Sequence, residues 1–175
     1  RHAAAQGIVA PDIVVMPRPV SPFNWTISVF DGQDYRLAHV NTRRTQRLDA
    51  DAPGSWWPAF LRRYSAPYEP ERLARWLIVP RLGDANTPAW VGQAWRHEAF
   101  GFYRWFTQTP ALLQAEETLD AQGRLQRCAW FRDLRFEVPG RDGGPFRYGL
   151  CLPAADAPGA PARLFKLEGG QRTPV

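Results

Sequence analysis

Alternation of apolar and polar residues predicts β-strands in the first quarter of the chain. Residues 13–16 are apolar and mostly β-branched, and residues 25–30 and 35–40 each alternate with a period of two. Between the last two segments, Asp31-Gly32-Gln33-Asp34 has the composition of a turn. We therefore predict an antiparallel hairpin formed by residues 25–30 and 35–40.

Helical patterns lie in the middle of the chain. Residues 57–64 and 71–78 are each predicted to form a short helix, and Pro70 suits the entry to the second. Thr87-Pro88 is a helix-start signal, and the apolar residues that follow it recur at helical spacing up to residue 106. The predicted buried stripe of this longest helix consists of Val91, Trp95, Ala99, Phe102 and Phe106.

The rest of the chain returns to β patterns. Strands are predicted over residues 112–119, 125–138 and 146–152, with a last short strand over 163–167. Hairpins grouped around one long helix favour an α+β fold over alternating βαβ units. We expect a mainly antiparallel sheet of about five to six strands with a central helix packed on one face. The predicted inward residues of this sheet are Trp25, Ile27, Val29, Trp130, Leu134 and Phe136.

Length and composition indicate one globular domain. The chain has 175 residues, of which 45% are hydrophobic and 22% are charged. No apolar run approaches the ~20 residues that a membrane-spanning helix needs. We predict a juxtamembrane lead-in segment over residues 1–12, a single α+β domain over 13–168 and a C-terminal tail over 169–175. Because residue 1 is Arg rather than Met, we expect the chain to be part of a longer protein.

The formal net charge is +5, and all but one of the 22 basic residues are Arg. These residues are scattered rather than gathered into a stripe, so no nucleic acid partner is expected. The densest group, Arg43, Arg44 and Arg47, is predicted to lie in a solvated loop, with contact to a phosphate or a lipid headgroup as the alternative. The two cysteines, Cys128 and Cys151, are predicted to be buried free thiols.

No complete catalytic signature is present, so the catalytic residues are unknown at this stage. The sequence contains no Gly-rich phosphate loop, no Gly-x-Ser-x-Gly motif and no Cys-x-x-Cys motif. No metal site is predicted in this chain, because the three histidines lack carboxylate or Cys partners at metal-ligand spacing. These histidines are His2, His39 and His97.

One polar pair stands out on the predicted strand over residues 125–138. Asp133 and Arg135 are two residues apart and share one face of the strand. We favour an ion pair or a cross-strand network for them, with binding of an acidic ligand by Arg135 as the alternative. We expect this pair either to face solvent or to form a polar contact with the Pro-rich segment near Arg18 and Asn24. The candidate binding residues are therefore Arg18, Asn24, Asp133 and Arg135.

Two segments resemble one family of bacterial proteins. Residues 16–25, Met-Pro-Arg-Pro-Val-Ser-Pro-Phe-Asn-Trp, resemble the entry to the extramembrane region of bacterial membrane-bound proteins classed as metal-dependent hydrolases. Residues 102–106, Phe-Tyr-Arg-Trp-Phe, followed by residues 130–136, Trp-Phe-Arg-Asp-Leu-Arg-Phe, are similar to the aromatic helix and the Asp-Leu-Arg-aromatic strand of that family. Together these segments span most of residues 13–152.

The resemblance implies that the chain is the soluble C-terminal domain of an inner-membrane protein, on the cytoplasmic side. Family members carry amino-terminal transmembrane helices with His- and Asp-containing motifs, to which the metal-dependent activity is ascribed. No cofactor is expected in this chain, and a divalent metal would belong to the membrane part. The expected partners are that membrane-embedded part and the membrane surface. The expected function is then that of an accessory or regulatory domain of a hydrolase.

An alternative function does not depend on the membrane part. The chain would be a self-sufficient binding module for a small molecule or a protein, with aromatic side chains as pocket walls and Arg as the polar group that orients the ligand. Unrelated functions share α+β folds of this kind, so the fold alone does not choose between the two.

Overall fold

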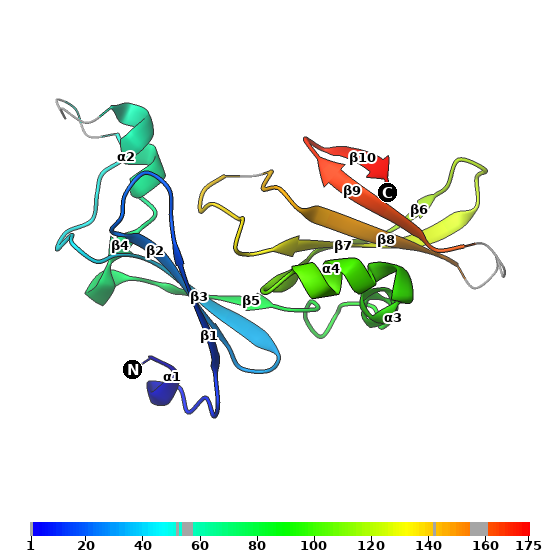
Figure 1. The fold of residues 1–175 in the computed structure, drawn as a ribbon, viewed down its shortest axis with the longest axis horizontal. Helices are drawn as coiled ribbons and strands as arrows, with labels where there is room; N and C mark the ends of the chain where they lie inside the picture. The colour runs from blue at the N-terminus through cyan, green and yellow to red at the C-terminus, as the bar shows by residue number, and fades with distance from the viewer. Residues whose placement is uncertain (1, 52, 54–57, 142, 155–160) are drawn as a thin grey trace. The chain divides into compact units, whose positions relative to one another are not determined.

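The computed structural model describes residues 2–51, 53, 58–141, 143–154 and 161–175 (Figure 1). The chain divides into two compact units, Arg1–Val79 and Pro80–Val175. Each unit contains one five-stranded sheet. The predicted mainly antiparallel α+β fold is confirmed, but the strands form two sheets instead of one. The single domain over residues 13–168 stays a prediction, because two compact units can still unfold in one cooperative step.

The first sheet contains the predicted hairpin. Strands β2 (Asn24–Phe30) and β3 (Asp34–Asn41) are antiparallel. The Asp31 carboxylate closes their turn by accepting hydrogen bonds from the backbone N–H groups of Gln33 and Asp34. The other strands of this unit are β1 (Asp12–Pro17), antiparallel to β2, β4 (Glu69–Pro70), parallel to β3, and β5 (Trp76–Pro80), which also pairs with β3.

The helices of the first unit are short. The lead-in segment contains α1 (His2–Ala5), and the predicted helix over residues 57–64 is found as α2 (Ala59–Ser65). The helix predicted over residues 71–78 is wrong. Only a 3-10 turn, η1 (Glu71–Leu73), forms there, and β5 follows. The run of Leu77, Ile78 and Val79 is rich in β-branched residues, and pairing with β3 stabilises it as a strand.

Strand β2 is covered on both faces. Asn24, Thr26 and Ser28 are buried, although the alternation predicted that they point outward. Of the residues predicted to point inward, Val29 is buried, whereas Trp25 and Ile27 are only partly buried. Burial of the Asn24 and Thr26 side chains is tolerated because both form hydrogen bonds within the unit.

The second sheet is antiparallel throughout, in the order β10-β9-β8-β7-β6. Its last strand comes from the segment that we predicted as a C-terminal tail. Gly169 and Gly170 both have positive φ and close the turn that brings this strand against its neighbour. The strands are β6 (Pro110–Leu119), β7 (Leu125–Asp133), β8 (Arg147–Pro153), β9 (Arg163–Glu168) and β10 (Gln171–Pro174).

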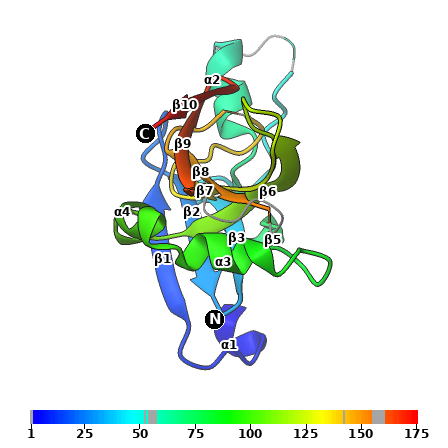
Figure 2. The same cartoon turned by 90° about the vertical axis from the view of Figure 1, so that its right-hand side faces the viewer.

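The long helix predicted after Pro88 breaks at His97. The pieces are α3 (Trp90–Arg96), the 3-10 turn η2 (Glu98–Phe100) and α4 (Gly101–Phe106), and α3 and α4 face the viewer in Figure 2. His97 has an extended backbone, and its ring Nδ1 accepts a hydrogen bond from the Ala99 N–H at 3.2 Å. Arg104 donates to the carbonyls of Trp95 and His97, both at 2.7 Å. These bonds satisfy backbone groups that the break leaves without helical partners.

The break changes which side chains of this segment are buried. Val91 and Trp95 are buried as predicted, but Ala99 is exposed and Phe102 is 59% exposed. The predicted stripe is therefore wrong at Ala99 and Phe102, because the helical period does not continue through His97, whereas Phe106 is partly buried and packs against the core cluster. The buried cluster of the second unit contains Val91, Ala94, Trp95, Phe100, Tyr103, Ala129, Phe131 and Leu150.

Trp130 lies on the opposite face of β7 from this cluster. Ala129 and Phe131 pack with α3, so the alternation of the strand directs Trp130 to the other face, where it is 2% exposed. The prediction that Trp130 packs against the helix is wrong by one residue in register. On its own face, Trp130 donates its indole N–H to Glu116 at 2.7 Å and packs against Phe165.

Cys128 and Cys151 form a disulfide, so the prediction of free thiols is also wrong. The two residues lie directly opposite each other on β7 and β8, with Cα atoms 4.0 Å apart. They are 23 residues apart in the sequence, and only the register of the sheet brings them together. The disulfide lies beside Trp130 in a small buried cluster.

Replacing Gly149 with Ala should destabilise the second unit. Gly149 is opposite Trp130 on β8, and a Cβ atom there would collide with the indole ring. We expect Gly149→Ala to lower the free energy of unfolding by about 1–3 kcal/mol, measured by chemical denaturation. The control is Gly101→Ala, where the added Cβ meets only ordinary contacts and the effect should stay within about 1 kcal/mol. Equal stability of the two variants would contradict this placement of Trp130.

Candidate functional site

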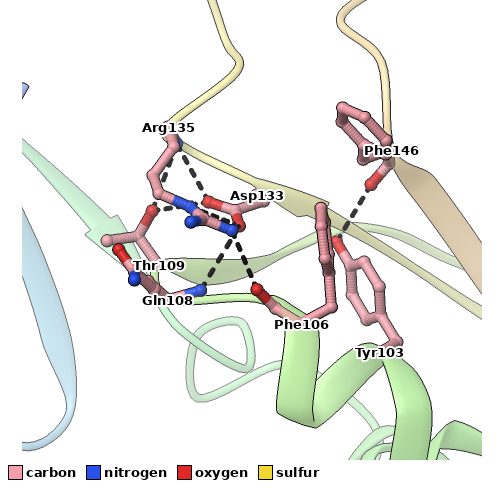
Figure 3. Close-up of polar contacts among 7 residues, drawn as sticks. All are labelled: Tyr103, Phe106, Gln108, Thr109, Asp133, Arg135 and Phe146. Carbon is pink, nitrogen blue, oxygen red and sulfur yellow. Dashed lines mark hydrogen bonds and ion pairs between the residues drawn. The ribbon is translucent and has the colours of Figure 1, made fainter.

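The Asp133–Arg135 pair forms a buried polar centre in the second unit (Figure 3). Asp133 is completely buried, and its Oδ2 accepts hydrogen bonds from Arg135 Nε at 2.8 Å and Nη2 at 2.6 Å. Its Oδ1 accepts from the Thr109 hydroxyl at 2.8 Å and from the Arg135 backbone N–H at 3.0 Å. The Gln108 N–H also donates to Oδ2. Both carboxylate oxygens are therefore satisfied within the unit.

Arg135 is held equally firmly. Its Nη2 also donates to the carbonyl of Phe106, the last residue of α4, at 2.9 Å. The guanidinium lies over the rings of Phe106 and Phe136, 5.4 and 5.0 Å from their centroids. The pair thus ties the end of α4 to the segment after β7. This arrangement supports the structural interpretation of the two residues that the sequence favoured.

The surroundings of Asp133 act on its pKa in opposite directions. Burial alone raises the pKa, but the hydrogen bonds from Arg135 and Thr109 together outweigh burial and hold the pKa of Asp133 below its ordinary value. Nearby, burial and the negative charge of Asp133 raise the pKa of Tyr103, whose hydroxyl donates to the Phe146 carbonyl at 3.2 Å. Asp133 therefore stays ionised and Tyr103 stays neutral near pH 7.

The other two candidate residues, Arg18 and Asn24, belong to the first unit. Arg18 is 8% exposed and donates from Nε to the Thr26 hydroxyl at 2.7 Å, and this hydroxyl lies 2.9 Å from His39 Nδ1. Burial and the positive charge of Arg18 lower the pKa of His39 to about 4. His39 is therefore a neutral, partly buried hydrogen-bonding residue near pH 7. Contact between the Arg18 segment and the Asp133–Arg135 pair stays a prediction.

Asn24 joins three separate segments of the first unit. Its side-chain N–H donates to the Ser65 hydroxyl at the end of α2, and its carbonyl oxygen accepts from the Asn41 amide at 2.7 Å. The side-chain carbonyl oxygen of Asn41 then accepts hydrogen bonds from the backbone N–H groups of Arg43 and Arg44. This chain of hydrogen bonds fixes where the arginine-rich loop leaves β3.

A cavity of about 710 Å³ lies beside this network. Apolar atoms make up most of its wall, and the polar side chains include three arginines that come from the loop and from α2. The segment before β2 forms another wall, where Val20 has a left-handed backbone (φ 79°) that is strained for a β-branched residue. The apolar part of the lining includes Val20, Phe23 and Leu48, and its cationic part consists of Arg43, Arg44 and Arg62.

Arg44 is the most constrained cation of this wall. Its Nη2 donates to the carbonyls of Ser65, at 2.7 Å, and Tyr68. Its Nη1 is shielded from water and has no hydrogen-bond partner among the described residues. Burial lowers the pKa of Arg44, although the group stays charged at any physiological pH. No ion pair formed by Arg44 is present within the described part of the chain, so its charge is not neutralised there.

Among the residues that the structure describes, His39 and His97 belong to no cluster of metal-ligating side chains. Within the described ranges, no group of three or more His, Cys, Asp and Glu side chains is arranged to hold a metal ion. The side chain of His2 lies outside the described residues. No helix among the described residues is long and apolar enough to span a bilayer.

Comparison with protein-family models, curated proteins and solved structures finds no match to this chain. The geometry of the chain itself is therefore the basis for a functional proposal. The sequence singled out Arg43 and Arg44 through their proximity to each other, but it missed Arg62 and Asn41, which reach the same cavity from other elements. The signal for Asn41 was an amide at the end of an apolar strand, next to the basic loop.

Disruption of the Asp133–Arg135 pair should reveal strong energetic coupling. Asp133→Asn and Arg135→Gln should each destabilise the chain by about 3–5 kcal/mol, because each leaves a buried partner unsatisfied. The double variant should be less destabilised than the sum of the singles by about 1–3 kcal/mol. Denaturant-induced unfolding of the unchanged chain, the single variants and the double variant measures the free energies that make up this double-mutant cycle. The control cycle uses the more exposed pair Glu117 and Arg127, where coupling should not exceed about 1 kcal/mol. Additive effects at Asp133 and Arg135 would contradict the structural role.

Proposed function

We propose that this chain is a ligand-binding domain whose first unit holds an anionic ligand with an apolar part. The observation that carries the proposal is the cavity lined by Arg44, whose charge no ion pair neutralises within the described part of the chain. A volume of about 710 Å³ lies within the range of roughly 300–1,000 Å³ typical of small-molecule sites. Mostly apolar walls with a few convergent polar groups are also typical of such sites.

Electrostatics favour an anion as the ligand. Among the described residues that line the cavity, three are arginines and none is acidic. A charge that is withdrawn from water without a counter-ion is costly, and a bound anion would remove this cost. The Arg43 guanidinium is additionally placed over the Phe23 ring, 5.2 Å from its centroid, which orients it at the cavity wall.

The resemblance in the sequence gives this binding domain a context. The Pro-rich entry, which resembles the segment that follows the membrane helices of bacterial metal-dependent hydrolases, also supplies Val20 and Phe23 to the cavity wall. Occupancy of the cavity would therefore act on the segment that leads toward a membrane-embedded part. On this basis we propose an accessory or regulatory role at the inner membrane, with catalysis assigned to that part.

The disulfide leads us to propose the periplasmic side of that membrane, instead of the cytoplasmic side expected from the resemblance. Disulfides persist in oxidising compartments and are rare in the cytosol of mesophilic bacteria. Cys128 and Cys151 are the only cysteines of the chain, and both are buried in the disulfide-bonded state. An oxidising compartment is the setting in which this bond is kept.

Binding is expected for an anionic aromatic probe. Titration with 8-anilino-1-naphthalenesulfonate, followed by fluorescence and by calorimetry, should show one site per folded chain. Arg43→Gln and Arg44→Gln should each weaken binding about 10- to 100-fold, because each removes a charge-assisted contact. The control is Arg63→Gln, since Arg63 is exposed and pairs with Asp51 outside the cavity. Thermal melting confirms that each variant is folded. Equal affinity of all four proteins would contradict the proposed site.

Reduction of the disulfide should destabilise the second unit. A crosslink between residues that are 23 positions apart lowers the conformational entropy of the unfolded chain. In the chain-entropy model this stabilises the folded state by about 3 kcal/mol. Denaturant unfolding with and without reductant measures this difference, and the double variant Cys128→Ala, Cys151→Ala should be insensitive to reductant. In cells, acid quenching followed by thiol alkylation should leave both cysteines unmodified. Alkylation of both would contradict the proposed compartment.

A further inference from the structure

We infer that the anionic group recognised by this cavity is a phosphomonoester. The inference rests on the proposed function and assigns a chemical class to its ligand. Three arginines line the cavity, and two of them, Arg43 and Arg44, are consecutive and leave β3 through the turn that Asn41 fixes. The third, Arg62, projects from α2 and donates from Nε to the Ala50 carbonyl at 3.2 Å.

The number of arginines that line the cavity favours a phosphate over a carboxylate as the anionic group of the ligand. A carboxylate carries one negative charge and two oxygens, and a single bidentate arginine satisfies it. A phosphomonoester carries about −1.5 to −2 charges at pH 7 and three acceptor oxygens, so it can bond several guanidinium groups at once. Arginines from two different elements line one cavity that has no acidic residue among its described lining, and this composition matches the second case.

The apolar wall indicates that the phosphate is not the whole ligand. Val20, Phe23 and Leu48 line the same cavity, and its volume of about 710 Å³ far exceeds what one phosphate group fills. These side chains would contact the organic part of an ester. A phosphorylated small molecule and a lipid headgroup with a terminal phosphate both have this chemistry.

Calorimetric titration of the whole chain with matched probes tests the inference. We expect 1-naphthyl phosphate to bind at least tenfold more tightly than 1-naphthoate, and at least tenfold more tightly than inorganic phosphate. Arg43→Gln should weaken binding of 1-naphthyl phosphate about tenfold more than binding of 1-naphthoate, and so remove most of the preference for phosphate over carboxylate. Leu48→Ala should weaken binding of 1-naphthyl phosphate and leave the affinity for inorganic phosphate unchanged. Arg63→Gln is the control and should change none of these affinities.

The outcomes distinguish the ligand class from the proposed function. Equal or tighter binding of 1-naphthoate would overturn the phosphomonoester and leave the anion-binding function standing. Absence of binding by both naphthyl probes and by the sulfonate probe would overturn both. Because Arg44 also bonds to the carbonyls of Ser65 and Tyr68, Arg43→Gln serves as the decisive variant if Arg44→Gln fails to fold.

Sedimentation with vesicles separates the two sources of the phosphate. If the ligand is a lipid, the chain should sediment together with phosphatidylcholine vesicles that contain phosphatidic acid, and Arg43→Gln should abolish this co-sedimentation. Binding of 1-naphthyl phosphate without co-sedimentation with these vesicles would support a soluble phosphomonoester.

Discussion

The buried amide of Asn24 holds together the three segments on which the cavity depends. Its side chain bonds to Ser65 at the end of α2 and to Asn41 at the end of β3, and its backbone bonds to Ser21 and Arg18 of the Pro-rich entry. Because this side chain is completely buried, each unmade hydrogen bond would cost about 1–3 kcal/mol. The walls of the cavity come from distant parts of the sequence, and their relative positions follow from satisfying this one amide.

Local rules of sequence were enough to predict the part of this site that is local. The hairpin of β2 and β3 follows from alternation and from the Asp31 turn, and the basic loop was recognised because Arg43 and Arg44 are adjacent. The position of Arg62 depends instead on the hydrogen bonds that join Ser65, at the end of α2, to Asn24 and Arg44. The sequence carries no periodic signal for such tertiary contact, so this part of the cavity could not be predicted.

In the second unit, the errors at Trp130 and at the two cysteines share one physical cause. The alternation of a β-strand predicts that Ala129 and Trp130 point to opposite faces of β7. It does not predict which face packs against the helix when both faces are buried. We predicted that Trp130 faces the helix because its side chain is large and hydrophobic. In the structure Trp130 lies against Gly149, where the absence of a side chain leaves room for the indole ring. The same cross-strand register joins Cys128 to Cys151, and register is a property of the pairing of strands.

Arginines of the two units illustrate how structural and binding roles can be separated on physical grounds. Arg135 has its charge matched by Asp133 and its nitrogens shared between that carboxylate and the Phe106 carbonyl, so a ligand would have to displace bonds that already exist. Arg44 is anchored by two backbone carbonyls, which hold it in place without neutralising its charge. A guanidinium that is fixed but not neutralised retains its attraction for an anion. The state of its bonds, rather than the residue type or its prominence in the sequence, is therefore the reason why we propose Arg44, and not Arg135, as a ligand-binding arginine.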